Sequence, residues 1–187
     1  MRRITSIFLA GPDRWLPEPD AHLAKSAAMV ELAGFKPLIG AGDGMIETER
    51  SEVMAREIYA RTLETLRGAD AVVANLSPWR GVGPDPGTVF EVGFAAALGK
   101  PVFAYLNVAS EDEADVRGRV EAQFGASPDS TGTWRDADDC EIEDYGLPEN
   151  LMLWAEARRF YVIVTPEPLG DLTGLELCLE AVGLYSE

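Results

Sequence analysis

Short apolar runs alternate with segments of helical periodicity along most of the chain. Apolar runs bounded by Gly, Pro or Asp are typical of buried strands, whereas apolar residues three or four positions apart are typical of helices. The clearest strand is residues 70–76 (DAVVANL). The pattern predicts strands over residues 4–10, 36–39, 70–76, 101–106 and 160–164, and helices over residues 20–33, 48–67, 88–98, 150–157 and 172–182.

Strands that alternate with helices favour a parallel sheet covered on both faces. We therefore expect an α/β fold with a doubly wound, flavodoxin-like or Rossmann-like, five-stranded parallel sheet in three α/β/α layers. The chain has 187 residues, which suits a single domain over residues 1–187. Ligands of such folds bind beyond the carboxyl ends of the strands, at the topological switch point.

One acidic segment departs from the alternating pattern. Residues 111–144 hold twelve acidic residues and three arginines, a net charge of −9. We interpret this segment as part of an acidic surface insertion at about residues 107–144, with one or two helical turns near residues 115–124. Such a charged stretch is typical of a solvated surface.

Composition narrows the classes of partner. The 32 acidic and 16 basic residues give a net charge of −16, which disfavours nucleic acid and anionic membranes as partners. The absence of a membrane-length apolar run or a secretory signal favours a cytoplasmic protein. Cys140 and Cys178 are expected to be reduced thiols, and with one histidine, His22, they form no zinc-binding pattern. We expect His22 to be a surface residue.

The segment after the third predicted strand carries two carboxylates, Asp85 and Glu91. One interpretation is structural: Thr88 and Glu91 match a capping box, and Asp85 braces a turn. The other is chemical, because a carboxylate in the first turn of a helix is kept ionised by the helix dipole. A carboxylate nucleophile paired with a second acid is how retaining enzymes cleave glycosidic bonds. The glycines nearby match neither a dinucleotide fingerprint nor a P-loop.

Four blocks at fitting distances resemble the nucleoside 2-deoxyribosyltransferase family. The resemblance implies that Glu91 is the nucleophile that attacks C1′ of the deoxyribose. It implies that Asp85 holds the sugar hydroxyls and helps to protonate or orient the base, and that Asn150 reaches into a neighbouring subunit's site. The blocks are residues 7–12 (IFLAGP), 69–81 (ADAVVANLSPWRG), 85–93 (DPGTVFEVG) and 145–153 (YGLPENLML).

The resemblance also implies a set of substrate-binding residues. Phe8 stands where many members have a tyrosine that hydrogen-bonds the nucleophile, and Asn75 stands where an Asp is common. Trp15 is expected either near the base or in a packing role, and Met152 near the base. The remaining expected pocket residues are Gly11, Pro12 and Asp13 after the first strand, and Ser77, Arg80, Gly81 and Gly87 after the third.

Three functions follow as hypotheses. The first is a transferase that exchanges the nucleobase of 2′-deoxyribonucleosides through a covalent deoxyribosyl-Glu91 intermediate. The second is an N-glycosidase of nucleosides or nucleoside 5′-monophosphates, and the third is a module that binds nucleosides or nucleotides without turnover. For the first, we expect a nucleoside and a free nucleobase as partners. We also expect no metal or organic cofactor, and a homodimer or higher homo-oligomer with sites completed across the interface.

Overall fold

The computed structural model describes residues 3–41 and 50–186, and its centre is a five-stranded parallel sheet in the order β2-β1-β3-β4-β7. All five predicted strands are present, and the doubly wound α/β prediction is confirmed. The central strand β3 is fully buried along its length, as its continuous apolar sequence indicates. The strands are β1 (Ser6–Ala10), β2 (Lys36–Ile39), β3 (Ala71–Asn75), β4 (Val102–Val108) and β7 (Ala157–Val164).

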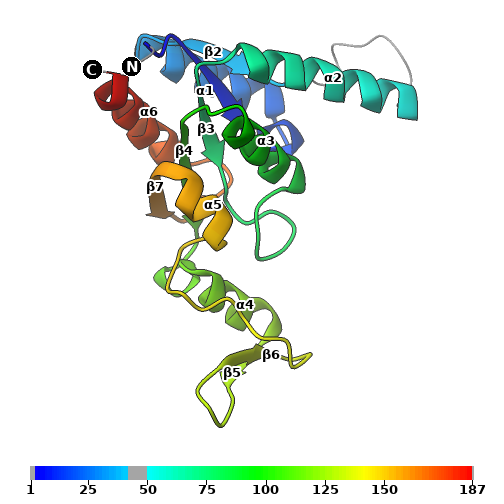
Figure 1. Ribbon diagram of the computed structural model, residues 1–187, viewed down its shortest axis with the longest axis vertical. Helices are drawn as coiled ribbons and strands as arrows, with labels where there is room; N and C mark the ends of the chain where they lie inside the picture. Colours follow the sequence, from blue (N-terminus) through cyan, green and yellow to red (C-terminus); the bar gives the residue numbers. More distant parts are fainter. Residues whose placement is uncertain (1–2, 42–49, 187) are drawn as a thin grey trace.

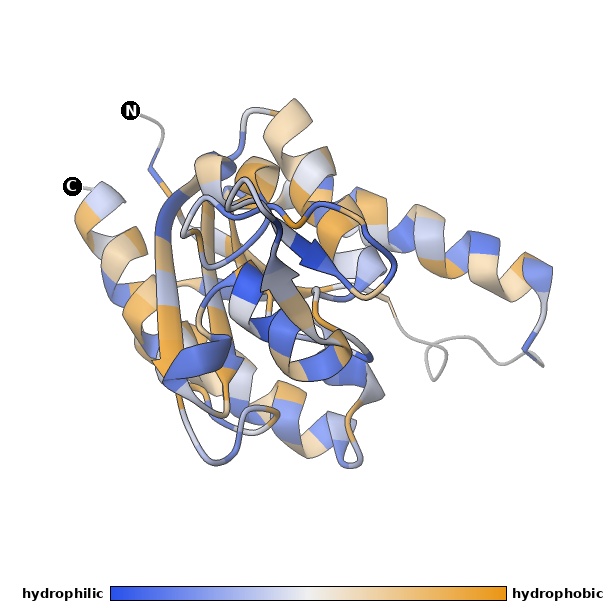
Figure 2. Ribbon diagram, turned by 90° about the horizontal axis from the view of Figure 1, so that it is seen from below, coloured by the Kyte–Doolittle hydropathy of each residue, from blue (hydrophilic) through white to orange (hydrophobic). Residues whose placement is uncertain are grey.

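Helices cover both faces of this sheet (Figure 1). One buried cluster joins one face to α1 (Pro19–Leu32) and α6 (Thr173–Ser186), with Val30 and Leu175 fully buried. A second cluster joins the other face to α2, α3 and α5. In Figure 2 the strands are mostly apolar, whereas the helices mix apolar and polar positions. These helices are α2 (Glu52–Gly68), α3 (Pro86–Ala97) and α5 (Leu151–Glu156).

The start of α3 differs from the sequence prediction. The helix begins at Pro86, and Asp85 is its N-cap, with the Asp85 carboxylate accepting a hydrogen bond from the Thr88 backbone N–H at 2.9 Å. Pro at the first helical position needs no backbone partner, which favours this start. Glu91 therefore lies in the second turn, and the capping box predicted between Thr88 and Glu91 is wrong. The predicted start of the second helix, at residues 48–49, lies outside the described residues.

The acidic segment contains more regular structure than its sequence indicates. It forms α4, as expected, and also a short antiparallel hairpin that the charge pattern does not predict. Figure 1 shows these elements projecting away from the sheet. Its elements are η3 (Glu111–Glu113), α4 (Val116–Phe124), β5 (Ala126–Pro128) and β6 (Trp134–Asp136).

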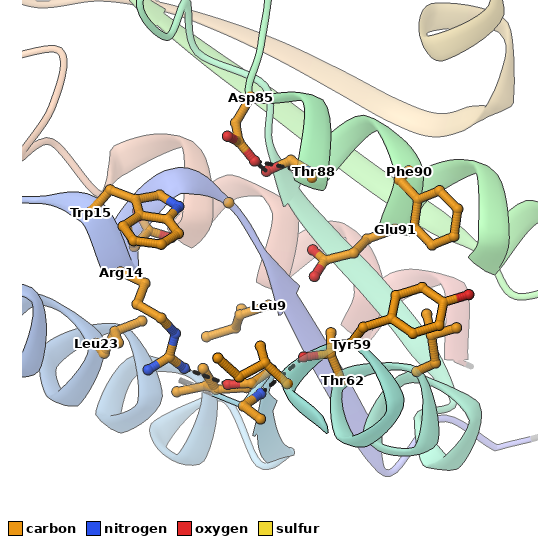
Figure 3. A pocket seen from close by; sticks show the side chains of 18 of the residues that line it. Leu9, Arg14, Trp15, Leu23, Tyr59, Thr62, Asp85, Thr88, Phe90 and Glu91 are labelled. Carbon is orange, nitrogen blue, oxygen red and sulfur yellow. Dashed lines mark hydrogen bonds between the residues drawn. The ribbon is translucent and has the colours of Figure 1, made fainter. Parts of the chain in front are cut away.

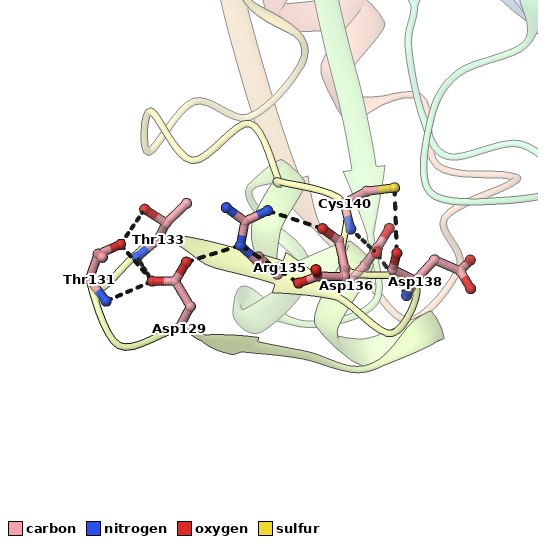
Figure 4. A network of polar contacts seen from close by, with 8 residues as sticks. Asp129, Thr131, Thr133, Arg135, Asp136, Asp138 and Cys140 are labelled. Carbon is pink, nitrogen blue, oxygen red and sulfur yellow. Dashed lines mark hydrogen bonds and ion pairs between the residues drawn. The ribbon is translucent and has the colours of Figure 1, made fainter.

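The carboxylates of the hairpin act as acceptors for its turns (Figure 4). Asp129 accepts hydrogen bonds from the Thr131 hydroxyl at 2.6 Å and from Arg135 Nε at 3.0 Å, which hold the pKa of Asp129 well below its usual range. Asp136 accepts from the backbone N–H groups of Asp138 and Cys140. Acidic residues are therefore used locally to satisfy backbone donors.

Candidate active site

A cavity of about 290 Å³ lies beyond the carboxyl ends of β1 and β2, beside the start of α3. The strand order reverses between β1 and β3, so this is the switch point at which doubly wound sheets bind ligands. A 3-10 helix, η1 (Pro12–Trp15), forms one wall, and α2 and α3 form the others (Figure 3). Of the sequence candidates, six line this cavity: Gly11, Asp13, Trp15, Asp85, Gly87 and Glu91.

The carboxylate of Glu91 points toward the middle of the cavity (Figure 3). The pKa of Glu91 is raised to about 7, mainly by burial and also by the negative charge of Asp85. The positive charge of Arg14 acts in the opposite direction. A carboxyl group that titrates near neutrality in a cavity is a common feature of catalytic sites.

Asp85 has a structural role and also lines the cavity. Its Oδ2 atom accepts hydrogen bonds from the Thr88 N–H at 2.9 Å and from the Thr88 hydroxyl at 3.2 Å. Neither bond uses Oδ1. The structural and chemical interpretations of Asp85 are therefore compatible, because capping the helix fixes the carboxylate at the mouth of the same cavity that contains Glu91.

The turn after β1 is tightly packed around Asp13. A side chain at Gly11 would place its Cβ 2.6 Å from Asp13 Oδ2 and 3.0 Å from the Cβ of Asn75, so any other residue there would displace the Asp13 carboxylate. Asn75 donates to Asp13 Oδ1 at 3.3 Å and accepts from Ser77 at 2.6 Å. Its amide thus joins two pocket segments. Pro12 is buried at the first position of η1.

The sequence analysis expects His22 to be a surface residue, but the structure places it against Asp13. Its Nε2 atom is 3.1 Å from Asp13 Oδ1, and both side chains are 12% exposed. The departure arises because His22 lies in the first turns of α1, which contacts η1.

Three exposed aromatic residues surround the cavity mouth: Trp15 from η1, Tyr59 from α2 and Phe90 from α3. The Tyr59 and Phe90 rings pack at 6.0 Å between centroids. Large aromatic side chains that remain half exposed beside a cavity indicate a surface for a flat ligand. The sequence analysis does not identify Arg14, Tyr59 or Phe90 as site residues. For Tyr59, the available signal is an aromatic residue on the polar side of a predicted helix.

Seven candidates lie outside the cavity lining, among them Pro12, at the start of η1. Phe8 is fully buried in the core between the sheet and α3. Ser77 is buried, and its hydroxyl accepts a hydrogen bond from the Asn107 N–H at 2.9 Å. Arg80 is exposed, has a positive φ of 54°, and stacks its guanidinium over Trp79. Gly81 follows Arg80 in the loop before α3.

Asn150 and Met152 also lie away from Glu91 within one chain. They line a separate groove with Val89 and Val92 from another side of α3. Asn150 caps α5 by accepting a hydrogen bond from the Met152 N–H at 3.0 Å, and its amide donates to Glu143 at 2.6 Å. The Met152 side chain is 72% exposed. The single chain therefore does not bring Asn150 to the cavity.

Residues 3–41 and 50–186, which the structure describes, contain neither a cluster of metal ligands nor a helix that could span a membrane. In this part of the chain, no group of three or more His, Cys, Asp and Glu side chains is arranged to hold a metal ion. None of the helices described there has the length and apolar character needed to cross a membrane.

Comparison with known proteins identifies the family. The sequence profile of the family described as nucleoside 2-deoxyribosyltransferase matches residues 7–152. The chain belongs to the nucleoside 2-deoxyribosyltransferase family. The matched residues include every candidate named from the sequence, from Phe8 to Met152. They also include the whole cavity wall, so the family assignment and the cavity concern the same part of the molecule.

Solved structures agree with this family assignment. A 2-desoxiribosyltransferase from Leishmania mexicana is 29% identical, with a TM-score of 0.61 over 83% of this chain and 89% of that one. A conserved protein from Enterococcus faecalis V583 is 16% identical and shares the fold, with a TM-score of 0.53 over 97% of this chain and 99% of that one. A search of curated protein sequences gives no significant match.

Proposed function

We propose that this protein exchanges the nucleobase of 2′-deoxyribonucleosides through a covalent deoxyribosyl intermediate on Glu91. The observation that carries the proposal is the Glu91 carboxylate, which points into the switch-point cavity with Asp85 beside it. Membership of the nucleoside 2-deoxyribosyltransferase family supports the same chemistry. A nucleoside fits a concave site with apolar walls and a few polar groups.

The proposed first step breaks the bond between C1′ and the base. An oxygen of ionised Glu91 attacks C1′, and the electron pair of the C1′–N bond passes to the base. The Asp85–Glu91 pair holds one proton, and Asp85 passes that proton to the departing base, which leaves neutral. This double displacement is the route of retaining glycosidases, and the positive charge that develops on the sugar is stabilised by the carboxylates.

The second step reverses the first with a different base. A ring nitrogen of the incoming base attacks C1′, and the bond between C1′ and Glu91 breaks. Glu91 leaves as a carboxylate, and the proton lost by the incoming base returns to Asp85. No atom or electron is left over, which agrees with a reaction that needs only a nucleoside and a free base. Transfer to water instead would release free deoxyribose.

The aromatic rim supplies the binding surface for the base in this proposal. Trp15, Tyr59 and Phe90 expose 57%, 55% and 50% of their surface beside the cavity. Covering such rings with a nucleobase removes apolar area from water and adds favourable stacking. Arg14 is the cation of the cavity wall, and its charge favours the ionised form of Glu91 that attacks the sugar.

Asn150 enters the proposal through a second copy of the chain. Its position on a different groove from Glu91 means that it cannot act on the same chain's cavity without rearrangement. Apolar side chains next to Asn150 are exposed, and a second copy would cover them. They are Leu151, Met152 and Trp154. We therefore propose a homo-oligomer in which Asn150 of one copy contacts the sugar bound by another.

The proposed function is tested by incubating the protein with deoxyadenosine and free cytosine. Formation of deoxycytidine supports base exchange. Free deoxyribose formed faster than deoxycytidine would instead identify an N-glycosidase. Binding of deoxyadenosine with neither product would identify a binding module. E91Q, which keeps the size of the side chain, is the matched control and is expected to lose exchange.

A further inference from the structure

The acidic insertion contributes one side chain to the structure around the active site. Arg119 belongs to α4, yet its side chain is only 3% exposed, which is unusual for a charged residue. It extends from the insertion toward the segment between β3 and α3. That segment, residues 79–84, leads directly into Asp85.

Arg119 makes three separate contacts with its guanidinium group. Nε donates to the Val82 carbonyl at 2.7 Å, one terminal nitrogen donates to the Glu113 carbonyl at 3.2 Å, and the other donates to Glu149 Oε2 at 2.9 Å. The planar fork of arginine serves several acceptors in fixed directions, which a lysine cannot do. The loop, the insertion and the Glu149 segment are thus tied to one side chain.

Glu149 extends this connection to Asn150. Its carboxylate is 5% exposed, and while Oε2 accepts from Arg119, Oε1 accepts from the Asn150 backbone N–H at 2.8 Å. Burial raises the pKa of Glu149, and the Asn150 N–H and Arg119 oppose that rise. A buried ion pair is weak evidence for stability, because desolvation offsets attraction. Specific geometry is the better explanation for retaining one here.

We propose that the Arg119–Glu149 pair is a positioning device that holds the loop before Asp85 and the segment carrying Asn150. This inference rests on the proposed function, because it assigns the two residues a role in that reaction. Val82 is three residues before Asp85, and Gly83 and Pro84 are the only residues between them. The Trp79 N–H donates to the Gly83 carbonyl at 2.9 Å, so the loop is closed on itself. Holding Val82 therefore fixes Asp85.

The direct test replaces both charges by apolar groups in R119M/E149M. This change leaves no unpaired buried charge, so the fold is expected to persist. The Val82 carbonyl and the Asn150 N–H lose their partners, and hydrogen–deuterium exchange of residues 79–90 is expected to accelerate. R119K keeps the charge without the fork and is the second variant, in case the double variant unfolds.

Kinetics distinguish positioning from general damage. If the pair places Asp85 for protonating the base, kcat/KM for exchange from deoxyadenosine is expected to fall about 10- to 100-fold. The loss is expected to be much smaller with 7-methyl-2′-deoxyguanosine, whose base leaves neutral without accepting a proton. R117M is the matched control, because Arg117 lies in the same helix but contacts Asp144 and Trp134. It is expected to retain wild-type kinetics with both donors.

Two results would overturn the inference. One is unchanged hydrogen–deuterium exchange of residues 79–90 in both R119M/E149M and R119K. The other is an equal loss of activity with the two donors in R119K, which would indicate damage unrelated to Asp85, because Glu149 keeps its bond to the Asn150 N–H in that variant. A wild-type protein with no activity on either donor would overturn the proposed function instead, and hydrogen–deuterium exchange would still decide whether the pair holds the loop.

Discussion

The ionisation that a nucleophile needs conflicts with the surroundings of Glu91. A nucleophile must be ionised, but burial and the neighbouring charge of Asp85 raise its pKa to about 7. The carboxylate is thus only partly ionised at neutral pH when the cavity is empty. Arg14 reduces this difficulty, because its positive charge favours the ionised form.

The first prediction concerns the pH dependence of kcat/KM for base exchange. Because the proposed step needs one proton on the Asp85–Glu91 pair, activity is expected to fall as pH rises through an apparent pKa of about 7, where the free enzyme loses that proton. R14Q is expected to move this loss of activity to higher pH, because the Arg14 charge lowers the pKa of Glu91, whereas R14K keeps the charge and is expected to leave it nearly unchanged. Profiles between about pH 5 and 9 measure both. An identical limb in the wild type and R14Q would contradict this assignment.

The second prediction concerns stability. Because the folded-state pKa of Glu91 is raised from 4.5 to about 7, the folded protein binds more protons than the unfolded chain between these values. Ionised Glu91 therefore lowers the free energy of unfolding above pH 7. This destabilisation disappears as pH falls below 4.5. E91Q is expected to be more stable than the wild type at pH 8, by at most about 3 kcal/mol, and equally stable at pH 4.

Urea unfolding at the two pH values measures this difference. E64Q is the matched control, since Glu64 is an exposed residue of α2 and lies outside the cavity. A stability gain of E91Q that is the same at pH 4 and pH 8 would show that the raised pKa is not its cause.

At the scale of elements, the start of α3 affects both the stability of the fold and the proposed reaction. Asp85 caps the helix with one carboxylate oxygen while the residue lines the cavity. D85A is expected to lose about 1 kcal/mol of stability together with activity. D85N keeps an N-cap acceptor, so it is expected to fold as stably as the wild type but lose about 100-fold or more in exchange, because the amide has no acidic proton. Wild-type exchange by D85N would contradict a role for Asp85 as an acid.

The elements could be predicted from the sequence wherever their signals are local. Strands such as residues 70–76 follow from continuous apolar runs, and the order of strands and helices predicts the parallel sheet. The start of α3 was misplaced because Thr88 and Glu91 mimic a capping box, while Asp85 with Pro86 provides the stronger cap. Helical spacing alone could not choose between these two starts.

The site, too, could be predicted only where its residues lie close together in the sequence. Asp85 and Glu91 follow a strand end in one stretch of sequence, so their approach depends on local structure. Arg14 and Tyr59 reach the cavity from η1 and α2, which requires knowledge of the tertiary arrangement. The Arg119–Glu149 pair joins residues 30 positions apart, and the charge pattern presents Arg119 as one more solvated side chain.

At the scale of the whole molecule, charge is unevenly distributed. Residues 111–144 carry −9 of the total −16. Two of its carboxylates, Asp129 and Asp136, accept hydrogen bonds within the hairpin turns, and Arg119 connects the same segment to the loop before Asp85. The overall charge consequently reflects the insertion more than the cavity, which is lined by Arg14 as well as by the two carboxylates.

The whole-molecule prediction concerns sharing of sites between copies. E91Q and N150A are each expected to be inactive alone, and a mixture that has been allowed to exchange subunits is expected to regain part of the activity. The reason is that one site of a mixed oligomer would have both an intact Glu91 and an intact Asn150. Kinetics of the mixture measure this recovery of activity. Sedimentation of each variant is the control for assembly. Absence of recovery in mixed oligomers would show that Asn150 acts within its own chain or not at all.

The most direct test of the central claim is mass spectrometry of the peptide that contains Glu91, after acid quenching during turnover of deoxyadenosine. We expect this peptide to gain the mass of one deoxyribosyl group, the adduct to disappear when free cytosine is added, and E91Q to show none. A wild-type enzyme that exchanges bases without an adduct on this peptide, or an adduct that persists in E91Q, would contradict the assignment of Glu91 as the nucleophile.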